Sequence, residues 1–463
     1  MQLVLDQMVP GVCATTLTRN STRAGLMGIA IILMASCASG PPAKLSVPAA
    51  ASGPVWSFQV GPIIDLLPTT ASEDDRVRTL VDSRSQVHVL IASAELKSLY
   101  DVRVGPDGVL ERTLVQSGVP PSTIDGALDE RGRLHVLLGF RHFLFDDTRW
   151  LESDQTPWAR AHLKVERPHF VRGAPRLIWV FDVSGKNVGA NWAWDWFGFG
   201  NAMGGLIWPW PSRGEKTVLV AEMATGEMNW TVLERDVKHD AIASCAASDR
   251  AGNVFVVYTK RRVILQTACD PRFVRIDAQA MGAAVPQSDA ASGHKEGDFP
   301  LRSAVGEALP GDAYILYGGP DIEHFPRRIF FQSDCLAVDP DEGGALFGWR
   351  LLWRAGTWNA TSEVRAFDAG KDYEWRAAAA GGGSFHGLFV YRRNNPGLFA
   401  SVRDYPVTYG KLTGTAWSQT VDVGTASGST IDVASTGPAK AFAVWPTQTG
   451  FVGRWIESTL QSQ

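Results

Sequence analysis

A short motif recurs along the chain: an extended segment ends in Asp, a turn follows, and a strongly apolar segment comes next. The clearest copies cover residues 80–90, 127–137 and 247–258. Asp followed by Gly favours a tight turn, because the Asp side chain caps its own backbone and Gly accepts a positive φ. Each copy therefore predicts a β-hairpin, and the repetition predicts a fold that is built from similar hairpins.

Weaker copies of the apolar strand extend the pattern to about seven repeats, within the usual range for propellers. They lie at residues 177–181, 313–317, 387–391 and 441–445. The 46 Gly and 26 Pro leave little room for long helices. We therefore predict an all-β protein, a β-propeller of about seven four-stranded blades. A β-sandwich or a pair of smaller β domains is the alternative.

The two ends of the predicted propeller complement each other. The last repeat offers three strands, near residues 430–434, 441–445 and 451–456, and then the chain ends. Residues 55–60 read as an outer strand without a repeat of its own. We expect this N-terminal strand to join the last blade and close the ring, so that no sheet edge is left bare.

The N-terminal region has the pattern of an export signal. Arg19 and Arg23 precede an apolar run at residues 24–34, which is shorter than the roughly 20 residues of a membrane-spanning helix. The run ends in Met-Ala-Ser-Cys at residues 34–37, which resembles the lipobox of bacterial lipoproteins. The resemblance implies that Cys37 carries the lipid anchor, and Ala38 after it resembles sorting to the outer membrane. An ordinary cleaved signal peptide is the alternative.

This pattern divides the chain into three parts. Residues 1–36 are the predicted signal peptide, residues 37–53 a flexible tether rich in Ala, Ser and Pro, and residues 54–463 the propeller domain. We expect the membrane to be a partner through the lipid anchor, and the domain to be a monomer. The net charge of −4, without a long basic run, does not favour nucleic acid as a partner.

Three cysteines remain for the exported domain, namely Cys245, Cys269 and Cys335. In an oxidising compartment one disulfide is possible, and we expect Cys245 and Cys269 to form it from neighbouring strands of one blade. Three buried, reduced cysteines are the alternative. The sequence has no Cys or His spacing typical of a zinc site, so we expect no metal and no cofactor.

The turn at residues 129–136, Asp-Glu-Arg-Gly-Arg-Leu-His-Val, resembles the repeats of sialidase-like propellers in bacterial secreted proteins. The resemblance extends over most of residues 55–457 and implies a propeller fold. The complete Asp-box, Ser-x-Asp-x-Gly-x-Thr-Trp, occurs nowhere, and the arginine motif that opens sialidases is absent. Sialidase activity is therefore not implied.

One segment, residues 187–211, departs strongly from the repeat. Long loops on rigid scaffolds often carry function, and Trp faces stack on sugar rings or other flat ligands. We predict a ligand-binding platform there; its residues are Trp192, Trp194, Asp195, Trp196, Trp208 and Trp210. The alternatives are a docking patch for a protein or lipid surface, and a loop that folds inward as a plug.

Candidate catalytic groups are few. His88 and His135 recur at equivalent positions of the repeat, which is typical of a structural role. His142, expected just after an inner strand and near the propeller mouth, is the best single candidate, and we also predict it to be a ligand-binding residue. We therefore predict a cell-envelope propeller that binds a glycan or a protein without catalysis. A carbohydrate hydrolase or polysaccharide lyase on the same scaffold is the alternative, and a structural member of an envelope complex is a third hypothesis.

Overall fold

The computed structural model describes most of the chain from Pro54 to Gln461. The ranges outside the described residues are 1–53, 73, 119–121, 147, 155, 161–164, 175, 185–215, 225–226, 237–238, 263–268, 282–301, 304–306, 309–335, 342, 348–350, 363–371, 393–404, 429 and 462–463. None of the described helices combines the length and the hydropathy that a membrane span requires.

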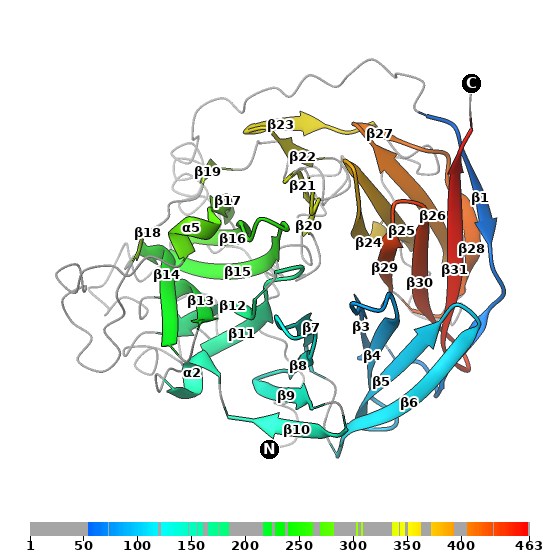
Figure 1. The fold of residues 1–463 in the computed structure, drawn as a ribbon, viewed down its shortest axis with the longest axis horizontal. Coiled ribbons are helices and arrows are strands. Elements are labelled where there is room, and N and C mark those ends of the chain that lie inside the picture. The colour runs from blue at the N-terminus through cyan, green and yellow to red at the C-terminus, as the bar shows by residue number, and fades with distance from the viewer. Residues whose placement is uncertain are drawn as a thin grey trace, which may run out of the picture.

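Seven separate sheets, here called A to G, contain the described strands. The first strand of each sheet contacts the first strand of the next, and the last contact returns to the beginning; these strands are β3, β7, β11, β15, β20, β24 and β29. Figure 1 shows the sheets arranged as a ring around a central axis. The predicted all-β propeller is therefore confirmed, and the sandwich alternative is wrong.

Sheets B and C are four-stranded antiparallel meanders. Sheet B contains β3 (Arg76–Val81), β4 (Val87–Ser93), β5 (Ser98–Gly105) and β6 (Gly108–Ser117). Sheet C contains β7 (Ile124–Leu128), β8 (Leu134–Leu138), β9 (Arg141–Phe145) and β10 (Trp150–Ser153). Every residue of the apolar strands β4 and β8 is buried, whereas the outer strand β6 is largely exposed. Burial thus decreases outward from the second strand, as the apolar repeat predicts.

Sheets D and E follow the same order and carry short additions. Sheet D contains β11 (Val165–Phe170), β12 (Ile178–Ser184), β13 (Lys216–Ala224), β14 (Glu227–Asp236) and β18 (Arg302–Ser303), which pairs with β14 in parallel. Sheet E contains β15 (His239–Ser248), β16 (Val254–Arg262), β17 (Cys269–Ile276) and β19 (Glu307–Ala308). Two single-turn helices, α2 (Pro157–Arg160) and α5 (Ala278–Met281), lie in the connections.

Sheets F, G and A complete the ring. Sheet F contains β20 (Leu336–Val338), β21 (Ala345–Phe347), β22 (Leu351–Arg354) and β23 (Thr357–Ala360). Sheet G contains β24 (Asp372–Gly381), β25 (Ser384–Arg392), β26 (Tyr405–Thr413), β27 (Ala416–Trp417) and β28 (Val421–Ala426). Sheet A contains β29 (Asp432–Gly437), β30 (Lys440–Thr447), β31 (Gly450–Leu460), β1 (Trp56–Val60) and β2 (Ile64–Pro68).

The recurring Asp organises the turn between the first and second strands. In sheet B, one carboxylate oxygen of Asp82 accepts hydrogen bonds from the backbone N–H groups of Arg84 and Gln86, both at 2.8 Å. Asp129 and Asp249 cap the equivalent turns of sheets C and E. The residue three positions after each Asp has a positive φ: Ser85 (61°), Gly132 (74°) and Gly252 (83°). The predicted Asp turns are confirmed.

The meander order assigns the connections to two opposite faces of the ring. The first three strands alternate in direction within each sheet, and the first strands of sheets D and E run parallel, as the bridge between Arg172 and Ala247 shows. All turns from first to second strands therefore share one face, here called the turn face. The connections from second to third strands, and from each sheet to the next, share the opposite face, here called the loop face.

The N-terminal strand lies beside the last strand of the chain. β1 pairs antiparallel with β31 from Trp56 opposite Leu460 to Val60 opposite Ile456, and β2 pairs with the start of β31. Figure 1 shows β1 alongside β31 at the edge of sheet A. Residues 55–60 thus include the outer strand β1 at the edge of sheet A.

The side chain of Phe58 provides a test of this pairing. Its ring packs against the core of sheets G and A and meets the ring of Tyr409 edge-on, with 5.3 Å between centroids. Replacement of Phe58 by Ala is expected to lower the free energy of unfolding by about 2 kcal/mol, measured by urea denaturation. Replacement of the exposed neighbour Gln59 by Ala is expected to change it by less than about 0.5 kcal/mol. Equal effects at both positions would show that β1 does not pack as described.

Candidate functional site

The described strand ends that flank three long connections lie on the loop face. Residues 185–215, between β12 and β13, and residues 393–404, between β25 and β26, both join a second strand to a third. Residues 309–335 join sheet E to sheet F on the same face. On a propeller scaffold, long connections grouped on one face are the usual position of a binding site.

Two exposed apolar side chains lie on this face in the described neighbouring sheets. Leu96, in the turn between β4 and β5, is 38% exposed, and Phe140, in the turn between β8 and β9, is 56% exposed. Sheet D is next in the ring, and its equivalent connection begins after Ser184 and ends before Lys216. The loop face therefore carries exposed apolar side chains on sheets B and C, and the described ends of the Trp-rich connection lie on the same face of sheet D.

A buried carboxylate, that of Asp75, binds to connections on the loop face between sheets A and B. Asp75 is fully buried and accepts hydrogen bonds from the backbone N–H groups of Ala94, at 2.7 Å, and Ser72, at 2.8 Å. Burial outweighs these two bonds and raises the pKa of Asp75. The hydroxyl group of Thr430 donates to the backbone oxygen of Asp75 at 3.0 Å, so that one residue ties three connections together.

Three histidines occupy equivalent positions on the second strands of sheets B, C and G. They are His88, His135 and His386, and each lies two residues before a Leu that pairs with the third strand. The third-strand residues opposite these leucines are Asp101, His142 and Tyr409. Each histidine hydrogen-bonds to the third-strand residue of its own sheet. The recurrence of His88 and His135 that the sequence indicated is confirmed, and His386 extends it.

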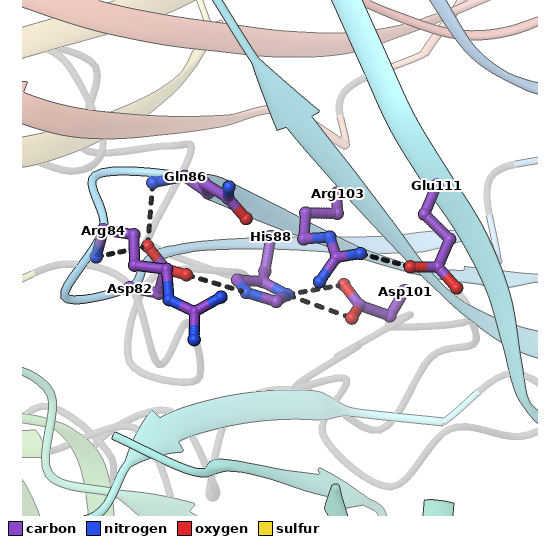
Figure 2. A network of polar contacts seen from close by, with 7 residues as sticks. All are labelled: Asp82, Arg84, Gln86, His88, Asp101, Arg103 and Glu111. Carbon is purple, nitrogen blue, oxygen red and sulfur yellow. Dashed lines mark hydrogen bonds and ion pairs between the residues drawn. The ribbon is translucent and has the colours of Figure 1, made fainter. Parts of the chain in front are cut away.

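In sheet B the histidine lies between two carboxylates, as Figure 2 shows. Its Nδ1 is 3.0 Å from a carboxylate oxygen of Asp101, and its Nε2 is 3.8 Å from Asp82. Burial alone disfavours the charged ring, but the hydrogen bond and charge of Asp101, together with Asp82, raise the pKa of His88 above its usual value. The Asp of the turn thus also stabilises the protonated histidine.

In sheet C a second histidine replaces the carboxylate. A carboxylate accepts hydrogen bonds, so we assign the proton of His135 to Nε2, which donates to Asp129 at 3.3 Å. His135 Nδ1 lies 2.8 Å from His142 Nε2 and then accepts a hydrogen bond from it. The ring of His142 meets the rings of Phe170 and Trp179 edge-on. Burial, followed by the charge of His135, lowers the pKa of His142 to about 3, so its ring is neutral at physiological pH.

The position of His142 differs from the sequence prediction. The sequence placed His142 just after an inner strand, near the mouth, but Gly139 and Phe140 form a tight turn, and β9 begins at Arg141. His142 therefore lies within a strand and is only 3% exposed. An external substrate does not reach a side chain buried in this way, so the geometry argues against a catalytic role.

In sheet G the equivalent pair is His386 and Tyr409. His386 Nε2 donates to the backbone oxygen of Gly437 at 2.9 Å, and the hydroxyl group of Tyr409 bonds to His386 Nδ1. Burial lowers the pKa of His386 to about 4 and raises the pKa of Tyr409. Beside them, Lys411 bonds to the backbone oxygen of Pro438, and its ammonium group lies 3.7 Å from the centroid of the Trp56 ring. The pair and the lysine connect sheets G and A.

A pocket of about 350 Å³ lies on the turn face, formed by turns of sheets A, E, F and G. Its charged lining residues are Arg250 and Asp341, which form an exposed ion pair at 2.6 Å. Gly381 and Thr436 contribute backbone and hydroxyl groups. The described lining contains one carboxylate, that of Asp341, and no histidine, so it lacks the pair of carboxylates that most glycosidases use.

The first strands are joined by a buried ion network near the axis. Arg78 in β3 is 2% exposed, and its Nε lies 3.1 Å from Asp125 in β7 while its Nη1 lies 3.7 Å from Asp432 in β29. Asp125 also accepts from the backbone N–H of Phe170 at 2.9 Å, and Asp432 from that of Thr79 at 2.6 Å. This network joins four sheets and has a structural role.

Cys245 in β15 is disulfide-bonded. The predicted partner, Cys269, is incompatible with the strand register: Cys245 pairs with Val257, Val257 pairs with Phe273, and Cys269 lies four residues from Phe273 along β17. Two strand spacings and four residues separate the two Cα atoms by about 16 Å. A disulfide requires less than about 7 Å, so the prediction of a Cys245–Cys269 bond is wrong.

Other predicted site residues lie outside the described residues. These are Cys37 and the six residues of the Trp-rich connection: Trp192, Trp194, Asp195, Trp196, Trp208 and Trp210. Among the described residues, no group of three or more His, Cys, Asp or Glu side chains is arranged to hold a metal ion. The third-strand partners Asp101 and Tyr409 were missed, because the spacing within one strand does not reveal the register of the next.

The chain matches no protein-family model and no curated protein. Among solved structures it is similar to a protein of unknown function from Dyadobacter fermentans, with 9% identity and a TM-score of 0.41 over 86% of this chain and 99% of that one. An α-L-arabinanase of Penicillium chrysogenum has 8% identity and a TM-score of 0.36 over 86% and 98%. A Hadza microbial sialidase has 10% identity and a TM-score of 0.34 over 82% and 65%. The fold assignment therefore depends on the sheets of this chain itself.

Proposed function

We propose that the chain is an exported, lipid-anchored propeller of seven blades, closed by β1, which binds a glycan through its loop face without catalysing a reaction. One observation carries the proposal: the described strands on either side of the Trp-rich connection end on the loop face, at Ser184 and Lys216, and this face also carries the exposed Leu96 and Phe140. Flat aromatic side chains grouped on a rigid face suit the apolar faces of sugar rings.

The described ionisable groups favour binding over catalysis. His88, His135, His142 and His386 are all less than a tenth exposed and bond to neighbouring side chains. Acid–base catalysis requires groups within hydrogen-bond reach of a substrate, which these buried pairs do not provide. The histidines are therefore structural in the proposed function.

The proposed location rests on two sequence features and one bond. The signal pattern ending at Cys37 supports lipid anchoring, with residues 37–53 as the tether, and Ala38 supports the outer membrane as destination. The disulfide of Cys245 supports an oxidising compartment, because disulfides rarely persist in the cytosol. The propeller would then stand outside the cytoplasm as a monomer.

A glycan array with the chain from Pro54 onward tests the function. We expect binding to at least one glycan, and a loss of affinity of at least about tenfold when Trp192, Trp194 and Trp196 are replaced by Ala. The matched control replaces the exposed Leu110 and Leu114 of β6, away from the loop face, and should leave binding unchanged.

The same material distinguishes the other hypotheses. Depolymerised product from a polysaccharide would overturn the binding proposal in favour of a hydrolase or lyase. Equal binding by the Trp variant and the control would remove the Trp-rich connection from the site. An absence of any glycan binding by a folded chain would contradict the glycan proposal and favour a protein partner in the envelope.

A further inference from the structure

The disulfide of Cys245 lies at the junction between sheets E and F. Cys245 is 1% exposed and belongs to a core cluster that includes Leu336 and Ala337 of β20. The strands β15 and β20 contact each other as neighbouring first strands of the ring. The side chain of Cys245 therefore belongs to a core cluster that spans sheets E and F and includes residues of β20 as well as Phe273 of β17.

Cys245 occupies one layer of residues around the axis. In five sheets, a first-strand residue pairs with a second-strand apolar residue twelve positions later; the pairs are Arg78 with Leu90, Asp125 with Leu137, Cys245 with Val257, Arg376 with Leu388, and Asp432 with Val444. In sheets B, C and E this first-strand residue stands four positions before the turn-forming Asp. Cys245 is thus the sheet E counterpart of Arg78 and Asp125.

Residues of this layer reach the layer residue of the next sheet. Arg78 in sheet B contacts Asp125 in sheet C, with 3.1 Å between Nε and Oδ1. The sheet that follows sheet E in the ring is sheet F. Its turn-forming residue is Asp339, which accepts a hydrogen bond from the backbone N–H of Asp341. Four positions before Asp339 stands Cys335, which directly precedes β20 in the sequence.

The alignment of the two strands gives the same partner independently. The backbone N–H of Arg250 donates to the backbone oxygen of Pro340 at 3.0 Å. β15 and β20 are both first strands, so the residue five positions before Arg250 and the residue five positions before Pro340 have equivalent positions in their repeats. These residues are Cys245 and Cys335.

We propose that Cys245 and Cys335 form a disulfide that joins sheets E and F within the axial layer, and that Cys269 remains a thiol. In its formation each of the two thiols loses a proton and the S–S bond forms. The two electrons pass to a disulfide-bearing oxidant of the export compartment, which is reduced to two thiols. The bond performs covalently, at this junction, what Arg78 performs ionically between sheets A, B and C.

Peptide mapping of the full-length chain, exported into an oxidising compartment, tests the pairing. The protein is denatured in iodoacetamide without reductant and digested with trypsin, which separates the three cysteines into residues 239–250, 263–272 and 329–350. We expect 239–250 linked to 329–350, and 263–272 alkylated. A link between 239–250 and 263–272, or alkylation of all three peptides, would overturn the proposal.

Two matched variants provide a second measurement. Cys335→Ser is expected to lower Tm by about 5 °C, whereas Cys269→Ser should leave Tm unchanged. With reductant present throughout, Cys335→Ser and the parent chain should melt together. A Tm loss in Cys269→Ser but not in Cys335→Ser would reject the pairing. If Cys335→Ser does not fold, the peptide map of the parent chain decides alone.

Discussion

Replacement of Arg78 by Met is expected to lower the free energy of unfolding by about 3–5 kcal/mol, the loss typical of breaking a buried ion pair on one side. The substitution leaves Asp125 and Asp432 in the interior without the guanidinium group that lies between them. Met retains much of the Arg side-chain volume, so the loss reports mainly on charge. Urea denaturation at pH 7, with the midpoint and slope determined separately, measures the effect.

Arg149 provides the matched control for this substitution. Its side chain is 73% exposed and lies 3.7 Å from Asp146, so Arg149→Met is expected to cost less than about 0.5 kcal/mol. A loss below about 1 kcal/mol in Arg78→Met would mean that the axial network does not hold the first strands together. In that case hydrophobic packing between the sheets would be sufficient to stabilise the ring.

A decrease in pH from 7 to 5 is expected to lower the free energy of unfolding by about 4 kcal/mol through His142 and His386. The folded state keeps both rings neutral, with pKa values of about 3 and about 4. The unfolded chain binds a proton at each below about pH 6.5. Stability is therefore present above pH 6.5 and is lost as the pH falls toward the folded pKa values.

The acid effect can be assigned to one residue. His142→Gln is expected to reduce the loss between pH 7 and pH 5 by about 2 kcal/mol, whatever its stability at pH 7, because one proton uptake disappears. His88 has the opposite effect on the pH dependence of stability. Its pKa is raised in the folded state, so its protonation at lower pH stabilises the folded chain. An unchanged pH dependence in His142→Gln, measured by urea denaturation at both pH values, would contradict the burial described for this ring.

The hairpin turns could be predicted because their determinants are local. Asp82 and Asp129 bind backbone N–H groups only two and four residues away, so a short window of sequence contains the whole interaction. Residues 55–60 could be recognised as an extended strand from their own residues, and β1 pairs with β31. The turns and the strand character of residues 55–60 could thus be predicted without knowledge of long-range contacts.

The errors concern contacts between strands. His142 was placed near the mouth because the apolar run before it ends at Leu138, and the two-residue turn that follows was not recognised. Cys269 was chosen because it lies on a strand close in sequence to that of Cys245. The register across β16 separates the two cysteines, and neighbouring first strands bring together residues far apart in the sequence. Periodicity within a strand contains neither piece of information.

The direction of β1 also determines how the molecule is oriented on a surface. β1 begins opposite Leu460, the end of β31, and β31 runs from the loop face to the turn face. The chain that precedes Trp56 therefore leaves from the turn face. If Cys37 holds the chain to a membrane as proposed, the turn face looks toward the lipid and the loop face toward the surrounding medium. The orientation presents the connection between β12 and β13 to large polymers that approach from outside.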